Sequence, residues 1–181
     1  MENRSDYKIL VVDDTPELLD ISLRVLRKAG FLAYPAESGK SCIKQLEEIK
    51  PDLVLLDVIL PDINGKELCK QIKQNPDYPG MHIILLSSFE VDAENIAKGL
   101  DDGADGYIIR PVRNIELIAR IEAQFRIIRA ERELSRVIKA LKRINNIYEG
   151  REEKMVDLKK EINRLLNELG QDNKYRIVKS N

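Results

Sequence analysis

Polar side chains suited to phosphate chemistry follow four short apolar runs in the first 111 residues. Asp13 and Asp14 follow the run at 9–12, Asp57 follows 53–56, Ser87 follows 83–86 and Arg110 follows 107–109. Three carboxylates brought together repel one another and raise one another's pKa values, unless a hard cation such as Mg²⁺ binds among them. Phosphoryl transfer uses such a site, because the cation neutralises the phosphoryl oxygens while a carboxylate, here Asp57, attacks in line. The Ser87 hydroxyl and the Arg110 guanidinium would each bind a phosphoryl oxygen.

The elements that must position these side chains follow from the hydrophobic pattern. Short, unbroken apolar runs are typical of strands that are buried on both faces, and residues 31–36 supply a fifth strand. Helical patterns lie between the runs, before Gly30, after Ser38, and at about 65–74, 92–101 and 114 onward. We predict a doubly wound α/β fold with a five-stranded parallel sheet. Ligands bind such sheets beyond the carboxyl ends of the strands, where the four polar sites lie.

Each polar site also has a simpler interpretation. The Asp13-Asp14 pair could cap a helix, Asp57 could start a turn, Ser87 could cap a helix and Arg110 could be a solvated charge. Their coincidence at four strand ends favours one shared site.

The first 125 residues or so resemble the receiver domain of two-component response regulators. The matching stretches are 9–14 (ILVVDD), 50–57 (KPDLVLLD), 60–65 (LPDING), 87–88 (SS) and 103–111 (GADGYIIRP). The resemblance implies the flavodoxin-like strand order 2-1-3-4-5. It further implies a phosphoacceptor at Asp57, a switch hydroxyl at Ser87 and a switch aromatic at Tyr107. It also implies a Mg²⁺ site formed by Asp13, Asp14, Asp57 and the backbone carbonyl of Val58, with Pro111 holding the next loop through a cis peptide.

The sequence departs from the family pattern at Arg110, where the family has lysine. Arginine keeps the charge but is longer, planar and forked, so its contact with an aspartyl phosphate need not be equivalent. A further feature concerns the positions two beyond Asp57 and two beyond Ser87, which are Ile59 and Phe89. Neither side chain can orient an attacking water, so we expect slow self-dephosphorylation.

Beyond Pro111 the sequence has sustained helical periodicity up to Gly170. An a/d seam, ten of whose eleven positions are apolar, comprises Leu134, Val137, Leu141, Ile144, Tyr148, Arg151, Met155, Leu158, Ile162, Leu165 and Leu169. The seam predicts a coiled coil and, we expect, a parallel homodimer through the C-terminal helix. Gly150 and Arg151 interrupt it, so a break that folds two helices into a hairpin is an alternative, as is a helix covering the receiver's own surface.

The domains we expect are a receiver at 1–128, a helical coiled-coil or hairpin extension at 129–170 and a tail at 171–181. Residues 1–111 carry 13 Lys/Arg and 20 Asp/Glu, whereas residues 112–181 carry 17 and 11, but the positive charges of the second part alternate with acidic residues. We therefore expect no nucleic-acid binding. Cys42 and Cys69 form no metal-binding or redox motif, and no run is apolar enough for a membrane span. These features favour a cytoplasmic protein with reduced thiols, and His82 begins a strand.

The leading hypothesis is a switch that takes a phosphoryl group on Asp57 from a histidine kinase or phosphotransfer protein. The chain would not be an enzyme, apart from Mg²⁺-dependent self-phosphorylation from a donor and slow self-dephosphorylation. One alternative is a phosphorylation-independent pseudo-receiver scaffold in which Arg110 pairs with Asp57. Another is a receiver fragment of a larger sensor kinase or cyclase, to whose linkers the C-terminal helix is similar. A haloacid-dehalogenase phosphatase is disfavoured, because Asp57 is followed by Val58-Ile59 rather than by a second acid.

Overall fold

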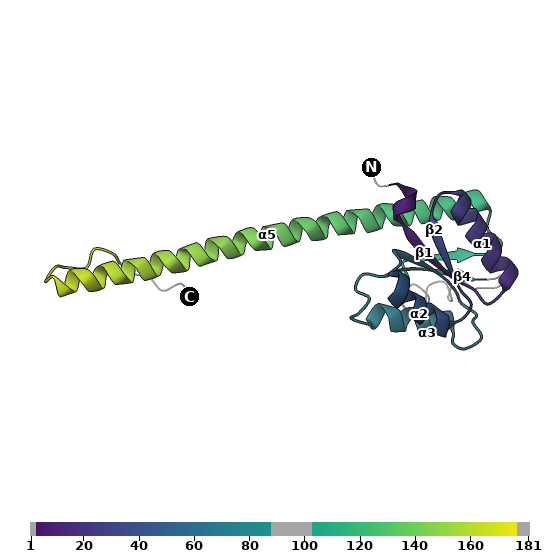
Figure 1. The fold of residues 1–181 in the computed structure, drawn as a ribbon, viewed down its shortest axis with the longest axis horizontal. Helices are drawn as coiled ribbons and strands as arrows, with labels where there is room; N and C mark the ends of the chain where they lie inside the picture. Colours follow the sequence, from purple (N-terminus) through teal and green to yellow (C-terminus); the bar gives the residue numbers. More distant parts are fainter. Residues whose placement is uncertain (1–2, 88–102, 177–181) are drawn as a thin grey trace. The chain divides into compact units, whose positions relative to one another are not determined.

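A five-stranded parallel sheet forms the centre of residues 1–128 (Figure 1). The structure, a computed structural model, describes residues 3–87 and 103–176. The strands lie in the order β2-β1-β3-β4-β5, which confirms the predicted order. Their bounds are β1 (Lys8–Val12), β2 (Leu32–Ala36), β3 (Leu53–Asp57), β4 (His82–Ser87) and β5 (Gly106–Ile109).

The helices begin where the sequence places its capping residues. A 3-10 turn, η1 (Arg4–Asp6), precedes the sheet, and the helices are α1 (Pro16–Lys28), α2 (Gly39–Ile49), α3 (Gly65–Gln74) and α5 (Asn114–Glu168). Ser38 caps α2 by accepting a hydrogen bond from the Ser41 N–H at 3.2 Å. The helix expected at about 92–101 falls on residues outside those described.

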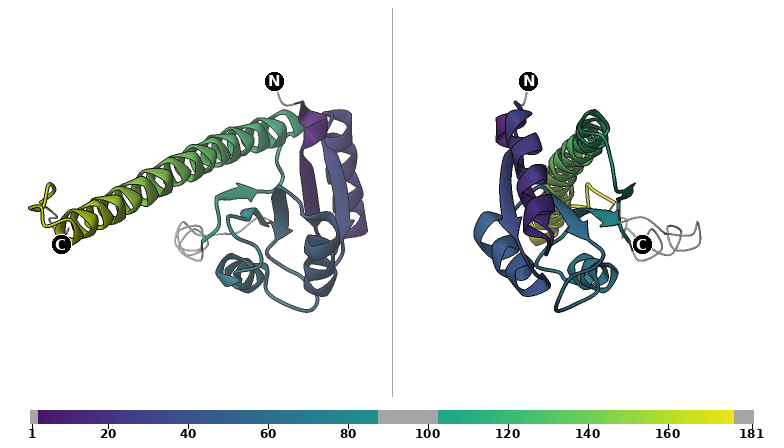
Figure 2. Two further views of the ribbon diagram at one scale, coloured as in Figure 1. Left: turned by 60° about the vertical axis from the view of Figure 1, so that its left-hand side comes forward. Right: turned by 90° about the vertical axis from the view of Figure 1, so that its right-hand side faces the viewer.

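Both faces of the sheet are covered, because successive residues of each strand point to opposite sides. Alternate residues such as Ile9, Val11 and Leu55 pack with α1 and with the first turns of α5, and their neighbours Leu10 and Val54 pack with α2 and α3. Figure 2 shows these two helical layers from two further directions. Strands β1, β3 and β4 are therefore buried on both sides, as predicted, whereas β5 is only partly buried and its Ile109 is 45% exposed.

Helix α5 is one continuous helix of 55 residues. It passes through Gly150 and Arg151 without a break, so the hinge and the hairpin considered as alternatives are not observed. A single glycine costs a helix only about 1 kcal/mol. The chain divides into two compact units, residues 1–128 and 129–181. Gly170, with φ +72°, ends the helix, and the Gln171 N–H bonds to the Leu166 carbonyl at 2.9 Å.

The residues after Gly170 are held by the side chain of Asn163. Its Oδ1 accepts the N–H groups of Lys174 and Tyr175 at 3.1 and 3.0 Å, and its Nδ2 donates to the Tyr175 carbonyl at 2.7 Å. The single amide thereby satisfies three main-chain groups, and Asn163 is itself buried.

Three smaller expectations concern single side chains and membrane spans. Cys42 and Cys69 are buried, and neither forms a disulfide within the described part of the chain. His82 begins β4, is buried, and lies 2.9 Å from Gln124 of α5 through its Nδ1. Among the helices of the described residues, none has the length and hydropathy needed to cross a bilayer.

Candidate functional site

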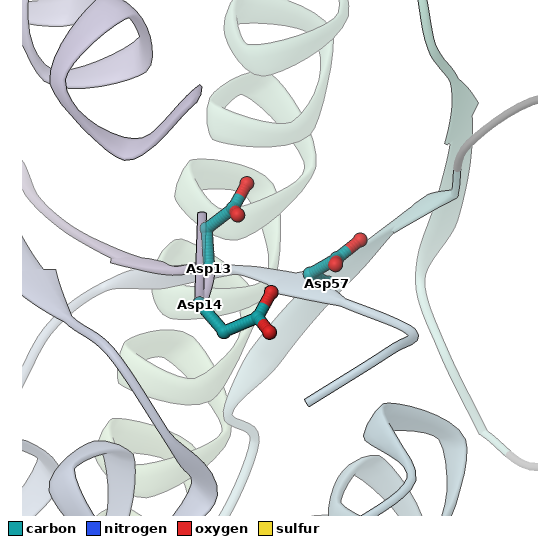
Figure 3. A group of neighbouring side chains, drawn as sticks. All are labelled: Asp13, Asp14 and Asp57. Carbon is teal, nitrogen blue, oxygen red and sulfur yellow. The ribbon is translucent and has the colours of Figure 1, made fainter. Parts of the chain in front are cut away.

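Three carboxylates lie together at the carboxyl edge of the sheet. Asp13 and Asp14 directly follow β1, and Asp57 is the last residue of the neighbouring strand β3. One carboxylate oxygen from each lies within 4.8 Å of the others (Figure 3). Asp13 is buried, Asp14 is exposed and Asp57 is half-buried. The parallel pairing of β1 with β3 brings together side chains that are more than forty residues apart in the sequence.

The pKa of the Asp57 carboxyl group is clearly shifted. Burial, followed by the charge of Asp13, raises the pKa of Asp57 to about 6, and the nearby charge of Arg110 opposes that rise. Both oxygens of the buried Asp13 carboxylate are hydrogen-bonded. Oδ1 accepts the Thr15 N–H at 2.9 Å, and Oδ2 accepts from Arg110 Nη1.

The donor set fits a small, hard divalent cation. Mg²⁺ is bound through oxygen and keeps several waters, so a few carboxylate oxygens around an open space suit it. The Val58 carbonyl, the fourth predicted ligand, accepts the Gly65 N–H at 2.8 Å, and a carbonyl oxygen has a second lone pair. The carboxylates of Asp13, Asp14 and Asp57 could hold the ion, and the Val58 carbonyl stays the predicted fourth ligand.

Arg110 follows β5 and pairs with Asp13. Its Nη2 lies 3.5 Å from Ser22 Oγ on α1, and its backbone N–H donates to the Ser87 carbonyl at 2.7 Å. Among the described residues no hydrogen bond or ion pair joins Arg110 to Asp57, so the pairing on which the scaffold alternative relied is not observed. The Arg110–Pro111 peptide is cis.

The remaining predicted site residues lie on β4, β5 and the loop after β3. Ser87 is the buried last residue of β4, and Tyr107 lies in β5. The Tyr107 hydroxyl is buried and has no hydrogen-bond partner within the described part of the chain. Ile59 is 65% exposed, whereas Ser88 and Phe89 lie outside the described residues.

Sequence reasoning assigned no role to Gly65, although it belongs to one of the matching stretches. It begins α3 directly against the end of β3, so a Cβ there would clash with the Asp57 carbonyl oxygen and lie 2.9 Å from Val58 Cα. The neighbouring Asp62 accepts the N–H groups of Gly39 and Lys40 at 2.8 and 2.9 Å, which lowers its pKa. Both residues fix the loop that carries Val58.

A groove of about 650 Å³ runs beside the cluster. Asp57 and Arg110 contribute polar groups to its lining, and Leu18 and Ile21, exposed apolar side chains of α1, line it together with Val112. Asp57 is therefore reachable from a surface that offers both charge and apolar contact.

Comparison with known proteins identifies this arrangement. The family model for the response regulator receiver domain matches residues 9–122. The chain belongs to the response regulator receiver family. Among curated relatives of this receiver, the DNA-binding response regulator MtrA of Mycolicibacterium smegmatis is 37% identical over 119 residues, 66% of this chain and 50% of MtrA. The regulatory protein VanRc of Enterococcus gallinarum is 38% identical over 119 residues, with the same two coverages.

Solved structures show the same receiver fold. A CheY-like response regulator receiver domain protein from Methanospirillum hungatei has a TM-score of 0.62 and 30% identity, covering 69% of this chain and 98% of that one. NtrX from Brucella abortus, crystallised with ATP, has a TM-score of 0.66 and 26% identity, covering 71% of this chain and 29% of NtrX. The receiver spans about half the length of the curated relatives it matches.

The raised pKa of Asp57 predicts that Asp57→Asn stabilises the metal-free receiver at pH 7.5. A carboxyl whose pKa is raised to about 6 in the folded state holds its proton more tightly there than in the unfolded chain. Its ionisation therefore lowers the free energy of unfolding as the pH rises from about 4 to 6, and the full cost is present above pH 6. We expect a gain of about 1 kcal/mol in the free energy of unfolding, less than the full shift implies because water screens a half-buried group. Urea unfolding between pH 4 and 8 measures it.

The gain in the free energy of unfolding from Asp57→Asn should disappear as the pH falls from 6 to 4. At pH 7.5, saturating Mg²⁺ should stabilise the wild type and so reduce the difference between the two proteins. Asp172→Asn, the same charge change on the exposed tail, is the control. An Asn variant less stable than wild type at pH 7.5 would contradict the assignment.

The clash at Gly65 predicts that Gly65→Ala distorts the loop carrying Val58. We expect a loss of about 2 kcal/mol or more in unfolding free energy, because backbone atoms of β3 must move to admit the methyl group. Gly150→Ala is the matched control, since a Cβ there meets nothing within 4 Å and should add up to about 1 kcal/mol to helix stability. Equal effects of the two substitutions would refute the positional argument.

Proposed function

We propose that this chain is a phosphorylation switch whose Asp57 accepts a phosphoryl group from a phosphohistidine of a kinase or phosphotransfer protein in the cytoplasm. The observation that carries the proposal is the group of Asp13, Asp14 and Asp57 at the carboxyl edge of a receiver sheet. Their types and spacing fit Mg²⁺-dependent transfer to a carboxylate.

In the transfer step a carboxylate oxygen of Asp57 attacks phosphorus in line. An O–P bond forms, the P–N bond of the phosphohistidine breaks, and the imidazole leaves with a proton. Mg²⁺, when bound, neutralises charge on the phosphoryl oxygens and keeps Asp57 ionised despite its raised pKa. Ser87 would bind one phosphoryl oxygen and Arg110 another, and Tyr107 would follow Ser87.

The groove beside Asp57 supports access by a protein donor. Its lining includes Leu18 and Ile21 of α1, exposed by 40% and 54%, which a helix of the donor could cover while its histidine reaches the carboxylate. The exposed Ile59 beside Asp57 cannot activate water, and supports a phosphoryl group that lasts for hours rather than seconds.

The output proposed is through α5 and a second copy of the chain. Helix α5 begins four residues after Arg110, and its first turns pack against the sheet through Leu117, Ile121 and Phe125. Farther along, all ten apolar seam residues from Leu134 to Leu169 are more than a third exposed. Because an apolar stripe exposed to water does not stabilise a single helix, we infer that a parallel helix of a second copy buries it.

Two other roles remain open to test. A phosphorylation-independent scaffold would use the same α5 seam without chemistry at Asp57. A receiver that serves a longer protein, such as a sensor kinase or cyclase, would use α5 as a connector. MtrA is named as DNA-binding, contrary to the expectation of no nucleic-acid binding here, but the match covers only half of MtrA. That expectation stays a prediction.

Phosphorylation is tested by incubating the chain with Mg²⁺ and acetyl phosphate and recording the intact mass. We expect one added phosphoryl group in the wild type, none in Asp57→Ala and none with EDTA. After the donor is removed, the adduct should decay over hours. Beryllofluoride with fluorine NMR gives an independent measure of the same site.

An adduct that persists in Asp57→Ala would move the acceptor elsewhere. No adduct with either reagent would favour the scaffold, and decay within seconds would remove only the proposed long lifetime.

Dimerisation through the seam is tested by disulfide trapping. Leu158 occupies a d position, where the two Cβ atoms of a parallel, in-register pair lie close together, so Leu158→Cys should cross-link on mild oxidation. Lys160→Cys, exposed on the outer face two residues on, is the control. The native Cys42 and Cys69 are buried and should not compete.

Equal cross-linking at 158 and 160 would indicate random collision. A monomer in analytical ultracentrifugation at micromolar concentration, with no cross-link at 158, would exclude the parallel dimer.

A further inference from the structure

Asp13 already has a cation as its partner. Its carboxylate is fully buried, with one oxygen bound by the Thr15 N–H and the other by Arg110 Nη1. The Arg110 side chain is itself only 14% exposed. A charge-assisted hydrogen bond between two buried ions is among the stronger contacts that a side chain makes.

The guanidinium is held in this place from more than one side. Its second nitrogen reaches Ser22 Oγ on α1 at 3.5 Å, while the Arg110 backbone is fixed to the Ser87 carbonyl at the end of β4. A planar fork can contact an aspartate and a hydroxyl at once, which a single ammonium group cannot do in the same way. The contact therefore belongs to the arginine that this chain has in place of the family's lysine.

We propose that Arg110 is a built-in competitor for the divalent cation at Asp13, and that cation binding releases the guanidinium toward the phosphoryl group on Asp57. The inference rests on the proposed function in one respect, that Asp13 is a ligand of the ion. It adds a regulatory step: the arginine exchanges one partner for another.

Competition follows from geometry and charge. A guanidinium on Asp13 Oδ2 occupies the space that an ion ligated by that oxygen would need, and its charge repels an incoming divalent cation. Asp14 is exposed and forms no hydrogen bond or ion pair with the described residues, so it remains open to the ion together with Asp57. An ion that then takes Asp13 leaves Arg110 beside a newly charged phosphoryl group, which a forked donor binds well.

The inference is tested by measuring Mg²⁺ affinity calorimetrically for wild type, Arg110→Met and Arg113→Met. Methionine keeps most of the aliphatic stem and removes the charge. Arg113 is exposed, three residues along the same loop, and loses the same charge without touching Asp13. We expect Arg110→Met to bind Mg²⁺ about tenfold more tightly and Arg113→Met to stay within about twofold of wild type. Equal gains in both variants would mean long-range charge and would overturn the inference, as would weaker binding by Arg110→Met.

A second measurement uses the wild type, in case Arg110→Met does not fold. Arginine side-chain NMR should show the Arg110 guanidinium protons shifted and rotating faster at saturating Mg²⁺, because the bond to Asp13 is lost. An unchanged Arg110 signal in an otherwise saturated protein would overturn the exchange.

The outcomes separate this inference from the proposed function. A chain that forms the Asp57 adduct, but whose Mg²⁺ affinity is indifferent to Arg110→Met, keeps its function as a switch and loses the competition. If the wild type neither binds Mg²⁺ nor forms the adduct, both the proposed function and the proposed competition are refuted.

Discussion

Like charges crowded at one edge of a buried sheet are the constraint on which the rest of this structure depends. Asp13, Asp14 and Asp57 lie within 4.8 Å of one another, and the burial of Asp57 makes its charge still less favourable. Such a group persists only when the backbone leaves it no alternative. Here the parallel pairing of β1 and β3 fixes both strand ends, and Gly65 seats α3 against the second of them.

The structure answers part of that repulsion with a charge of its own. Arg110 neutralises Asp13, the most deeply buried acid, and leaves the half-buried Asp57 and the exposed Asp14 facing the groove. The site is therefore asymmetric before any ligand arrives. The carboxylate with the raised pKa, that of Asp57, also lines the groove, which is consistent with its proposed role as phosphoacceptor.

The sequence was informative where local pattern and function coincide. Apolar runs before Asp13, Asp57 and Ser87 predicted the strands, because burial on both faces leaves an unbroken apolar pattern, whereas the order of the strands came from the resemblance to the receiver family. It was uninformative where the outcome depends on spatial neighbours. Nothing in the sequence indicates that Arg110 chooses Asp13 over Asp57, or that Gly65 meets the Asp57 carbonyl. Gly150 suggested a break in the helix that the structure does not show, because the surrounding helix-forming residues outweigh the cost of one glycine.

The Asn163 side chain binds the segment after Gly170 through main-chain groups of that segment. Asn163 bonds the N–H groups of Lys174 and Tyr175 and one carbonyl, and none of these bonds involves the side chains of the segment. Side-chain substitutions at Lys174 and Tyr175 therefore leave these three bonds possible, whereas loss of the Asn163 amide removes all three. Asn163 follows the a-position Ile162 and so lies beside the seam rather than on it. The reversal of the chain leaves the apolar stripe clear for a neighbouring helix.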